Sequence, residues 1–174
     1  MSPVAHSGVA LFTWQVAATR KNWKTLLLFL FAANLPDIDF ILNLILGRNR
    51  LILHQYFTHN FLFILVTVSL LSLALPSGRD RWGLILLGLS HLLLDIIVVD
   101  PSRPIGLRPF YPFSKALYDF GFFPYFDRWK LRTMISWRNG GVLLLEAAIF
   151  LVPVLIIYGK RILKTVRGRT FWAA

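Results

Sequence analysis

Cysteine is absent from this chain of 174 residues, which excludes disulfide bonds, thiolate metal sites and a cysteine nucleophile. Any metal ion must therefore be bound by histidine, carboxylate, backbone or water ligands. Acidic residues are scarce as well, because eight aspartates and glutamates stand against 19 lysines and arginines. The basic residues cluster between apolar segments, which is typical of contact with lipid headgroups and predicts no nucleic-acid partner.

The amino-terminal stretch lacks the basic region of a cleavable signal, since the first lysine or arginine is Arg20. Hydrophobic residues make up 56% of the chain, and the mean hydropathy is +0.62. Soluble domains contain about 45–50% apolar residues even when glycine is counted. We therefore predict an integral membrane protein, organised as a single domain over residues 1–174.

Four long apolar segments follow one another, at residues 25–47, 60–76, 82–100 and 141–159. They predict an all-α, polytopic membrane helical bundle with about four spanning segments. A short N-terminal helix over residues 8–20, capped by Ser7, precedes them. Residues 101–140 are rich in proline, glycine, aromatics and arginine, and predict an interfacial loop with a short amphipathic helix around residues 126–137. Residues 160–174 form a basic tail.

A proline interrupts the centre of the first long segment, in the stretch Asn34-Leu35-Pro36-Asp37. Pro36 removes a backbone donor and disfavours helix at Leu35, so we predict a break and a new half-helix from about Pro36. Asp37 and Asp39 would lie in the first turn of that half-helix, where the helix dipole favours anions. Broken helices are tolerated at membrane depth where they line a cavity or are buried in protein.

A histidine and an aspartate stand four residues apart in SHLLLD, within the apolar segment 82–100. His91 and Asp95 therefore share one helix face. Each ionisable residue at membrane depth costs roughly 2.5 kcal/mol or more by insertion scales, so a shared role is expected. Alternation of the spans brings the pair to one side of the membrane. The other residues on that side are Asp37, Asp39, His54 and His59.

Histidine and carboxylate ligands without cysteine suit Zn²⁺ best, with Mn²⁺ or Fe as alternatives. Bridging carboxylates would allow two ions about 3.5–4 Å apart. Asp37 and Asp39 cannot both point the same way in a regular helix. We therefore expect one of them to bind the metal ion and the other to contact a metal-binding residue from behind, unless the break turns both inward. Three other interpretations stay open: a packing histidine, an aspartate that only stabilises a helix start, and a proton relay.

The blocks SPVAHSGV, LPDIDFI, HQYFTHN, SHLLLD and IGLRPFYPFS occur in this order within residues 1–115. Together they resemble the membrane-bound metal-dependent hydrolase family of bacteria and archaea, the DUF457 or YdjM-like family. THN replaces the usual THS, so Asn60 stands where the family has a serine hydroxyl. The resemblance implies a protein of the bacterial or archaeal cytoplasmic (inner) membrane.

The family is similar, more distantly, to zinc-dependent phospholipase C and P1 nuclease. Those enzymes have further histidine ligands later in the chain, whereas no histidine follows His91 here. The similarity therefore implies fewer metal ions than in those enzymes, about two. Glu146, the only glutamate, would either complete the site or be a buried packing residue. The residues predicted to bind metal are His6, Asp37, Asp39, His54, His59, His91 and Asp95.

The function predicted from these residues is hydrolysis of a phosphoester, such as a lipid or lipid-linked phosphate, by metal-activated water. We expect Asp37 or Asp39 to be the general base, and Arg108 to bind phosphate oxygens unless it only contacts lipid headgroups. The expected partners are membrane lipids and the phosphoester substrate. The alternatives are a small proton-coupled transporter and a non-catalytic membrane protein that uses the same histidines and aspartates.

Overall fold

The computed structural model describes residues 1–39, 57–99, 106–127 and 135–160, and the statements below concern these ranges. The α-helices in them are α1 (Pro3–Ala17), α2 (Trp23–Asn34), α5 (Phe61–Ser72), α6 (Gly78–Ile96) and α8 (Trp137–Glu146). A 3-10 turn, η1 (Leu35–Asp37), follows α2, and a π-helical turn, η3 (Ala147–Leu151), follows α8. No strand is formed in this part of the chain, which confirms the predicted all-α class there.

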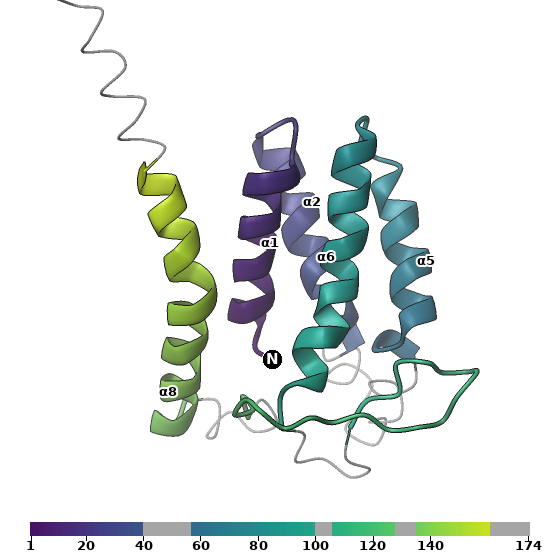
Figure 1. The fold of residues 1–174 in the computed structure, drawn as a ribbon, viewed down its shortest axis with the longest axis vertical. Helices are drawn as coiled ribbons and strands as arrows, with labels where there is room; N and C mark the ends of the chain where they lie inside the picture. Colours follow the sequence, from purple (N-terminus) through teal and green to yellow (C-terminus); the bar gives the residue numbers. More distant parts are fainter. Residues whose placement is uncertain (40–56, 100–105, 128–134, 161–174) are drawn as a thin grey trace, which may run out of the picture.

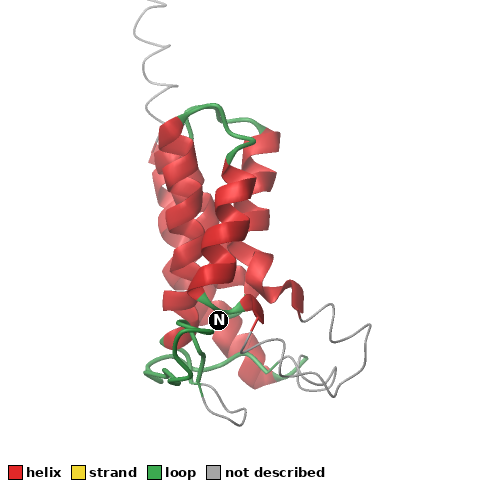
Figure 2. Ribbon diagram, turned by 90° about the vertical axis from the view of Figure 1, so that its right-hand side faces the viewer, coloured by secondary structure: helices red, strands yellow, loops and turns green. Residues whose placement is uncertain are grey.

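Helices α1, α2, α5 and α6 stand side by side as a bundle, and α8 with η3 packs beside α1 (Figure 1; Figure 2). The apolar centre contains buried side chains from all four bundle helices: Ala10, Phe29, Ile64, Val68, Leu84 and Leu87. Helix α6 approaches its neighbours closely at two glycines. A Cβ atom would lie 2.6 Å from the Ala17 Cβ atom at Gly83, and 2.7 Å from the Val68 Cγ2 atom at Gly88. Larger side chains would therefore push α6 away from α1 and α5.

The start of α1 lies earlier than predicted. Ser2 is the N-cap, its hydroxyl accepts a hydrogen bond from the Val4 N–H at 3.1 Å, and Pro3 occupies the first helical position. The prediction of Ser7 as the cap was wrong, because a serine cap followed by proline is the stronger start signal. The earlier start places His6 inside α1.

The predicted break in the segment 25–47 is confirmed. Helix α2 ends at Asn34, and Leu35, Pro36 and Asp37 form the 3-10 turn η1. Pro36 is buried, so the break faces protein, as broken helices at membrane depth require. Most of the predicted second half of this segment lies outside the described residues.

Among the described helices, one is long and apolar enough to cross a membrane, the 24-residue helix Trp137–Lys160 that includes α8 and η3. It corresponds to the predicted span 141–159. The other three predicted spans are not confirmed by length and composition. Helix α5 has 12 residues, which is about 18 Å against the roughly 30 Å of a bilayer core. The first turn of helix α6 contains the charged residues Arg79, Asp80 and Arg81.

Residues 106–127 form no helix and run across the end of the bundle where α6 ends and α5 begins (Figure 1). The Phe61 N–H donates to the Pro109 carbonyl at 2.6 Å, and the Phe120 N–H donates to the Ile96 carbonyl at 2.8 Å. These residues are non-helical, as expected for this part of the predicted loop 101–140, and the interfacial position of that loop stays a prediction. Most of the amphipathic helix predicted around residues 126–137 lies outside the described ranges, and Trp137 already belongs to α8. The basic tail lies outside them too, apart from its first residue.

Asp80 fixes the opposite end of the bundle and provides a test of this packing. It is fully buried, and its carboxylate accepts hydrogen bonds from the Thr19 N–H and hydroxyl, both at 2.8 Å. Asp80→Ala leaves these donors unsatisfied, so we expect a loss of about 1–3 kcal/mol and a lower Tm in detergent. Ser77→Ala is the control, because Ser77 makes no side-chain capping bond. Equal Tm values for the two variants would contradict this role.

Candidate metal centre

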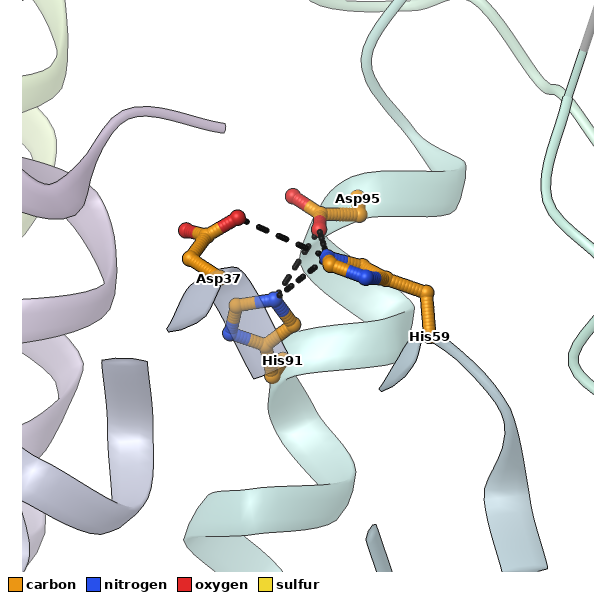
Figure 3. A group of neighbouring side chains, drawn as sticks. All are labelled: Asp37, His59, His91 and Asp95. Carbon is orange, nitrogen blue, oxygen red and sulfur yellow. Dashed lines mark hydrogen bonds and ion pairs between the residues drawn. The ribbon is translucent and has the colours of Figure 1, made fainter. Parts of the chain in front are cut away.

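Four ionisable side chains meet at one end of the bundle: Asp37 from η1, His59 from the turn before α5, and His91 and Asp95 from the last turns of α6 (Figure 3). One possible ligand atom from each lies within 4.8 Å of the others. The ends of α2 and α6 and the start of α5 all lie at this end of the bundle (Figure 1). The arrangement matches the metal-ligating types of the predicted site, and no sulfur ligand is involved.

The contacts converge on the Nε2 atoms of the two imidazoles. The His91 Nε2 atom lies 3.0 Å from the Asp95 Oδ2 atom and 3.2 Å from the His59 Nε2 atom. The His59 Nε2 atom lies 3.2 Å from the same Asp95 oxygen and 3.5 Å from the Asp37 Oδ1 atom. Both histidines are fully buried, whereas the two carboxylates are slightly exposed. Two nitrogen and two oxygen donors therefore face one small volume.

A backbone carbonyl sets the tautomer of His91. Its Nδ1 atom lies 2.7 Å from the Ala33 carbonyl oxygen, which can only accept a hydrogen bond. The proton of the neutral ring is therefore on Nδ1, and Nε2 presents a lone pair to the Asp95 oxygen. Two acceptors in contact require a positive charge between or on them, either a proton or a metal ion.

Thr58 and Asp39 hold the opposite side of the His59 ring. The Thr58 hydroxyl donates to the Asp39 Oδ2 atom at 2.7 Å and lies 3.0 Å from the His59 Nδ1 atom. Because that hydroxyl proton goes to the carboxylate, the Thr58 oxygen accepts the Nδ1–H of His59. The break at Pro36 thus directs Asp37 to the cluster and Asp39 behind it. The sequence analysis did not identify Thr58 as a site residue, although Thr58 directly precedes His59 in the chain.

His6 lies beside the cluster. Its ring stacks on His91, with the ring centroids 3.8 Å apart and the planes 15° apart. Its Nε2 atom lies 3.3 Å from the Asp95 Oδ1 atom, which also pairs with the Met1 α-amino group. Asp95 therefore faces the cluster with one oxygen and α1 with the other. His6 is not among the four residues whose ligand atoms share one volume.

The electrostatics of the cluster favour positive charge. Burial lowers the pKa of His59, but its hydrogen bonds with the carboxylates of Asp37 and Asp95 outweigh burial and raise the pKa to about 9. Without a metal ion, a proton on His59 can supply this positive charge. A divalent cation could replace it, since histidine nitrogen and carboxylate oxygen are suitable ligands for Zn²⁺, Mn²⁺ and Fe.

The other predicted site residues have different positions. His54 lies outside the described residues. Arg108 is half-buried in the loop 106–127, next to Pro109, whose carbonyl binds the residue two positions after His59. Glu146 is buried on α8 and bonds to Ser2, apart from the four clustered residues.

The fold and the site together define the class of the protein. It is a helical membrane protein in which two histidines and two aspartates lie together at one end of the bundle. The family model described as YdjM inner membrane protein matches residues 1–163, and the chain belongs to this family. The match confirms the resemblance found in the sequence and the predicted inner-membrane localisation. No curated protein and no solved structure matches the chain significantly. The similarity to phospholipase C and P1 nuclease therefore stays a prediction.

The two aspartates next to Pro36 should differ in their effect on metal content. Asp37→Asn removes a ligand, so we expect stoichiometric metal to be lost. Asp39→Asn acts on the cluster from behind, through Thr58 and His59, so metal should remain with an affinity lowered about 10–100-fold. Plasma mass spectrometry and chelator competition measure the two effects, with Asp119→Asn as a control in the loop. Full metal content in Asp37→Asn would contradict the assignment.

Metal binding should also depend on pH. Below about pH 9 the metal-free His59 carries a proton that the metal must displace, so binding releases this proton. Between about pH 6 and pH 8, the apparent affinity for Zn²⁺ should rise about tenfold per pH unit. Chelator competition at several pH values measures the slope. A flat profile would show that His59 is not deprotonated on binding.

Proposed function

We propose that this protein is a membrane-bound, metal-dependent hydrolase that cleaves a phosphoester, such as a lipid or lipid-linked phosphate. The observation that carries the proposal is the contact between the His91 Nε2 atom and the Asp95 Oδ2 atom, 3.0 Å apart, with His59 and Asp37 facing the same volume. This donor set suits Zn²⁺, with Mn²⁺ and Fe as alternatives. A bound divalent cation would supply a water of lowered pKa and positive charge for phosphoryl oxygens.

The chain's own residues would position the reaction. The Ala33 carbonyl orients His91, while Thr58 and Asp39 orient His59, so both rings are fixed before a ligand arrives. Asp39 is fully buried behind His59. Of the two aspartates proposed as general base, Asp37 is therefore better placed to accept a proton from water at the cluster, with the carboxylate oxygen that does not bind the metal ion.

Arg108 is the residue proposed to bind the phosphate oxygens. The loop that carries it is hydrogen-bonded to the start of α5, through the Phe61 N–H and the Pro109 carbonyl. This attachment holds the loop at the end of the bundle where His59 lies. A guanidinium can donate two parallel hydrogen bonds to a phosphate group. Its positive charge would also offset the repulsion between an anionic substrate and the two carboxylates of the site.

The surface around the cluster supports a lipid substrate. The loop 106–127 exposes the aromatic side chains Phe110, Phe113, Phe120 and Phe122, of which Phe113 is 85% exposed. Trp137, 98% exposed, begins the candidate membrane span at the same end of the bundle (Figure 1). Exposed aromatic rings are enriched where membrane meets water. The cluster would then lie near headgroup depth, where lipid phosphates are found.

The rival function is a proton-coupled transporter, in which the cluster binds a proton instead of a metal. The contacts of the His59 Nε2 atom with the Asp95 and Asp37 carboxylates, at 3.2 and 3.5 Å, are the observation that favours it, because these carboxylates stabilise an imidazolium and raise the pKa of His59. Transport would move a substrate or protons across the membrane without chemical turnover and without stoichiometric metal.

Turnover by the metal-loaded protein tests the proposal. Purified protein with Zn²⁺ is offered phosphatidic acid, glycerophospholipids and polyprenyl phosphates in mixed micelles, and phosphate or headgroup release is measured. We expect turnover that the His91→Ala/Asp95→Ala double variant loses and that Leu93→Ala, an exposed position between them, retains. Arg108→Ala should keep its metal and lose about tenfold or more in kcat/KM, because a charge-assisted hydrogen bond is removed. Proton movement into liposomes by metal-free protein without turnover would favour the transporter.

A further inference from the structure

Glu146 ties the last helix to the start of the first. It is 2% exposed, and its Oε1 atom accepts a hydrogen bond from the Ser2 N–H at 3.1 Å. Its Oε2 atom accepts another from the Ser2 hydroxyl. The same hydroxyl caps α1 by accepting from the Val4 N–H. A carboxylate on α8 therefore fixes the residue at which α1 begins.

A second contact between the same two helices lies one and a half turns further along α1. A Cβ atom at Gly8 would lie 2.6 Å from the Phe150 Cβ atom and 3.0 Å from the Phe150 backbone carbon. Phe150 belongs to η3, the π-helical turn that directly follows Glu146. Gly8 is needed here because any larger side chain would separate α1 from η3. Ser2 and Gly8 thus hold the first turns of α1 against the last span.

His6 lies between these two attachments. Its ring stacks on His91, and its Nε2 atom lies 3.3 Å from the Asp95 Oδ1 atom. A shift of the start of α1 would therefore move His6 relative to two members of the cluster. His6 is buried, so its ring cannot reach the same partners from a different helix position without repacking.

We propose that Glu146 is a positioning residue for the metal centre. Through Ser2 it fixes the first turn of α1, and through α1 it holds His6 against His91 and Asp95. The last helix, the candidate membrane span, thereby becomes part of the framework of the site. The inference rests on the metal centre of the proposed function and does not depend on which reaction that centre performs.

Metal affinity is the first readout. Glu146→Ala removes both acceptors of Ser2, so we expect the Kd for Co²⁺ or Zn²⁺, measured by chelator competition, to rise about 10–100-fold. The visible spectrum of bound Co²⁺ should change as well, because the ligand geometry changes. Glu146→Gln keeps one carbonyl acceptor for the Ser2 N–H and should restore part of the affinity. Val142→Ala, a buried position on the same helix, is the matched control for lost packing.

A double-mutant cycle tests the route through His6. If Glu146 acts through His6, Glu146→Ala should add little to the affinity already lost in His6→Ala. A full additional loss in the His6→Ala background would overturn the proposed route. Wild-type affinity in Glu146→Ala would overturn the proposal itself, as would an equal loss in Val142→Ala.

Hydrogen exchange of the metal-free protein separates this inference from the proposed function. Glu146→Ala should speed amide exchange in residues 3–8 relative to the wild type, whereas Val142→Ala should not. This measurement reports how firmly the first turn of α1 is held by Glu146, even if the wild type binds no metal. Faster exchange with no metal binding in any variant would retain the attachment and overturn the role in a metal centre. Unchanged exchange in Glu146→Ala would overturn the attachment.

Discussion

The arrangement of the site depends on the contacts of the Asp95 carboxylate. One of its oxygens contacts the imidazoles of His59 and His91, and the other faces His6 and the Met1 amino group. It thereby joins α1, the turn before α5, and α6 at one point. A carboxylate in an apolar bundle is stable only with such partners, because burial of an unpaired charge costs several kcal/mol, on the order of the stability of a small protein.

In both clustered histidines, a hydrogen bond to the Nδ1 atom determines the tautomer. A carbonyl of α2 accepts the Nδ1–H of His91, and Thr58, itself bound to Asp39, accepts that of His59. Each ring therefore directs its Nε2 atom to the same volume. This pattern is expected of ligands that are oriented before the ion binds, and it lowers the entropy lost on binding. It also explains why two neighbouring aspartates in LPDID have different surroundings.

Local rules were sufficient to predict much of the site. The four-residue spacing of His91 and Asp95 places them on one helix face, and alternation of helices brings Asp37 and His59 to the same end. The direction of each aspartate could not be predicted, because the 3-10 turn at Pro36 departs from regular helix geometry. The bonds between Ser2 and Glu146 join residues 144 positions apart, and no local pattern signals such a pair. Three of the four predicted spans are not confirmed in the described residues; at α5 the apolar segment contains a helix of 12 residues followed by a turn.

The close approach at Gly88 has a consequence for the spacing of the two clustered histidines. Gly88 packs on Val68 of α5 and lies three residues before His91, while His59 lies just ahead of α5. The distance between the two helix axes therefore controls the gap between the two imidazoles. A rigid gap discriminates between ions by radius, since each cation tolerates only a narrow range of bond lengths. If the cluster binds a metal ion as proposed, a glycine buried among aliphatic side chains, with no functional group of its own, would thus bear on the size of the ion that fits.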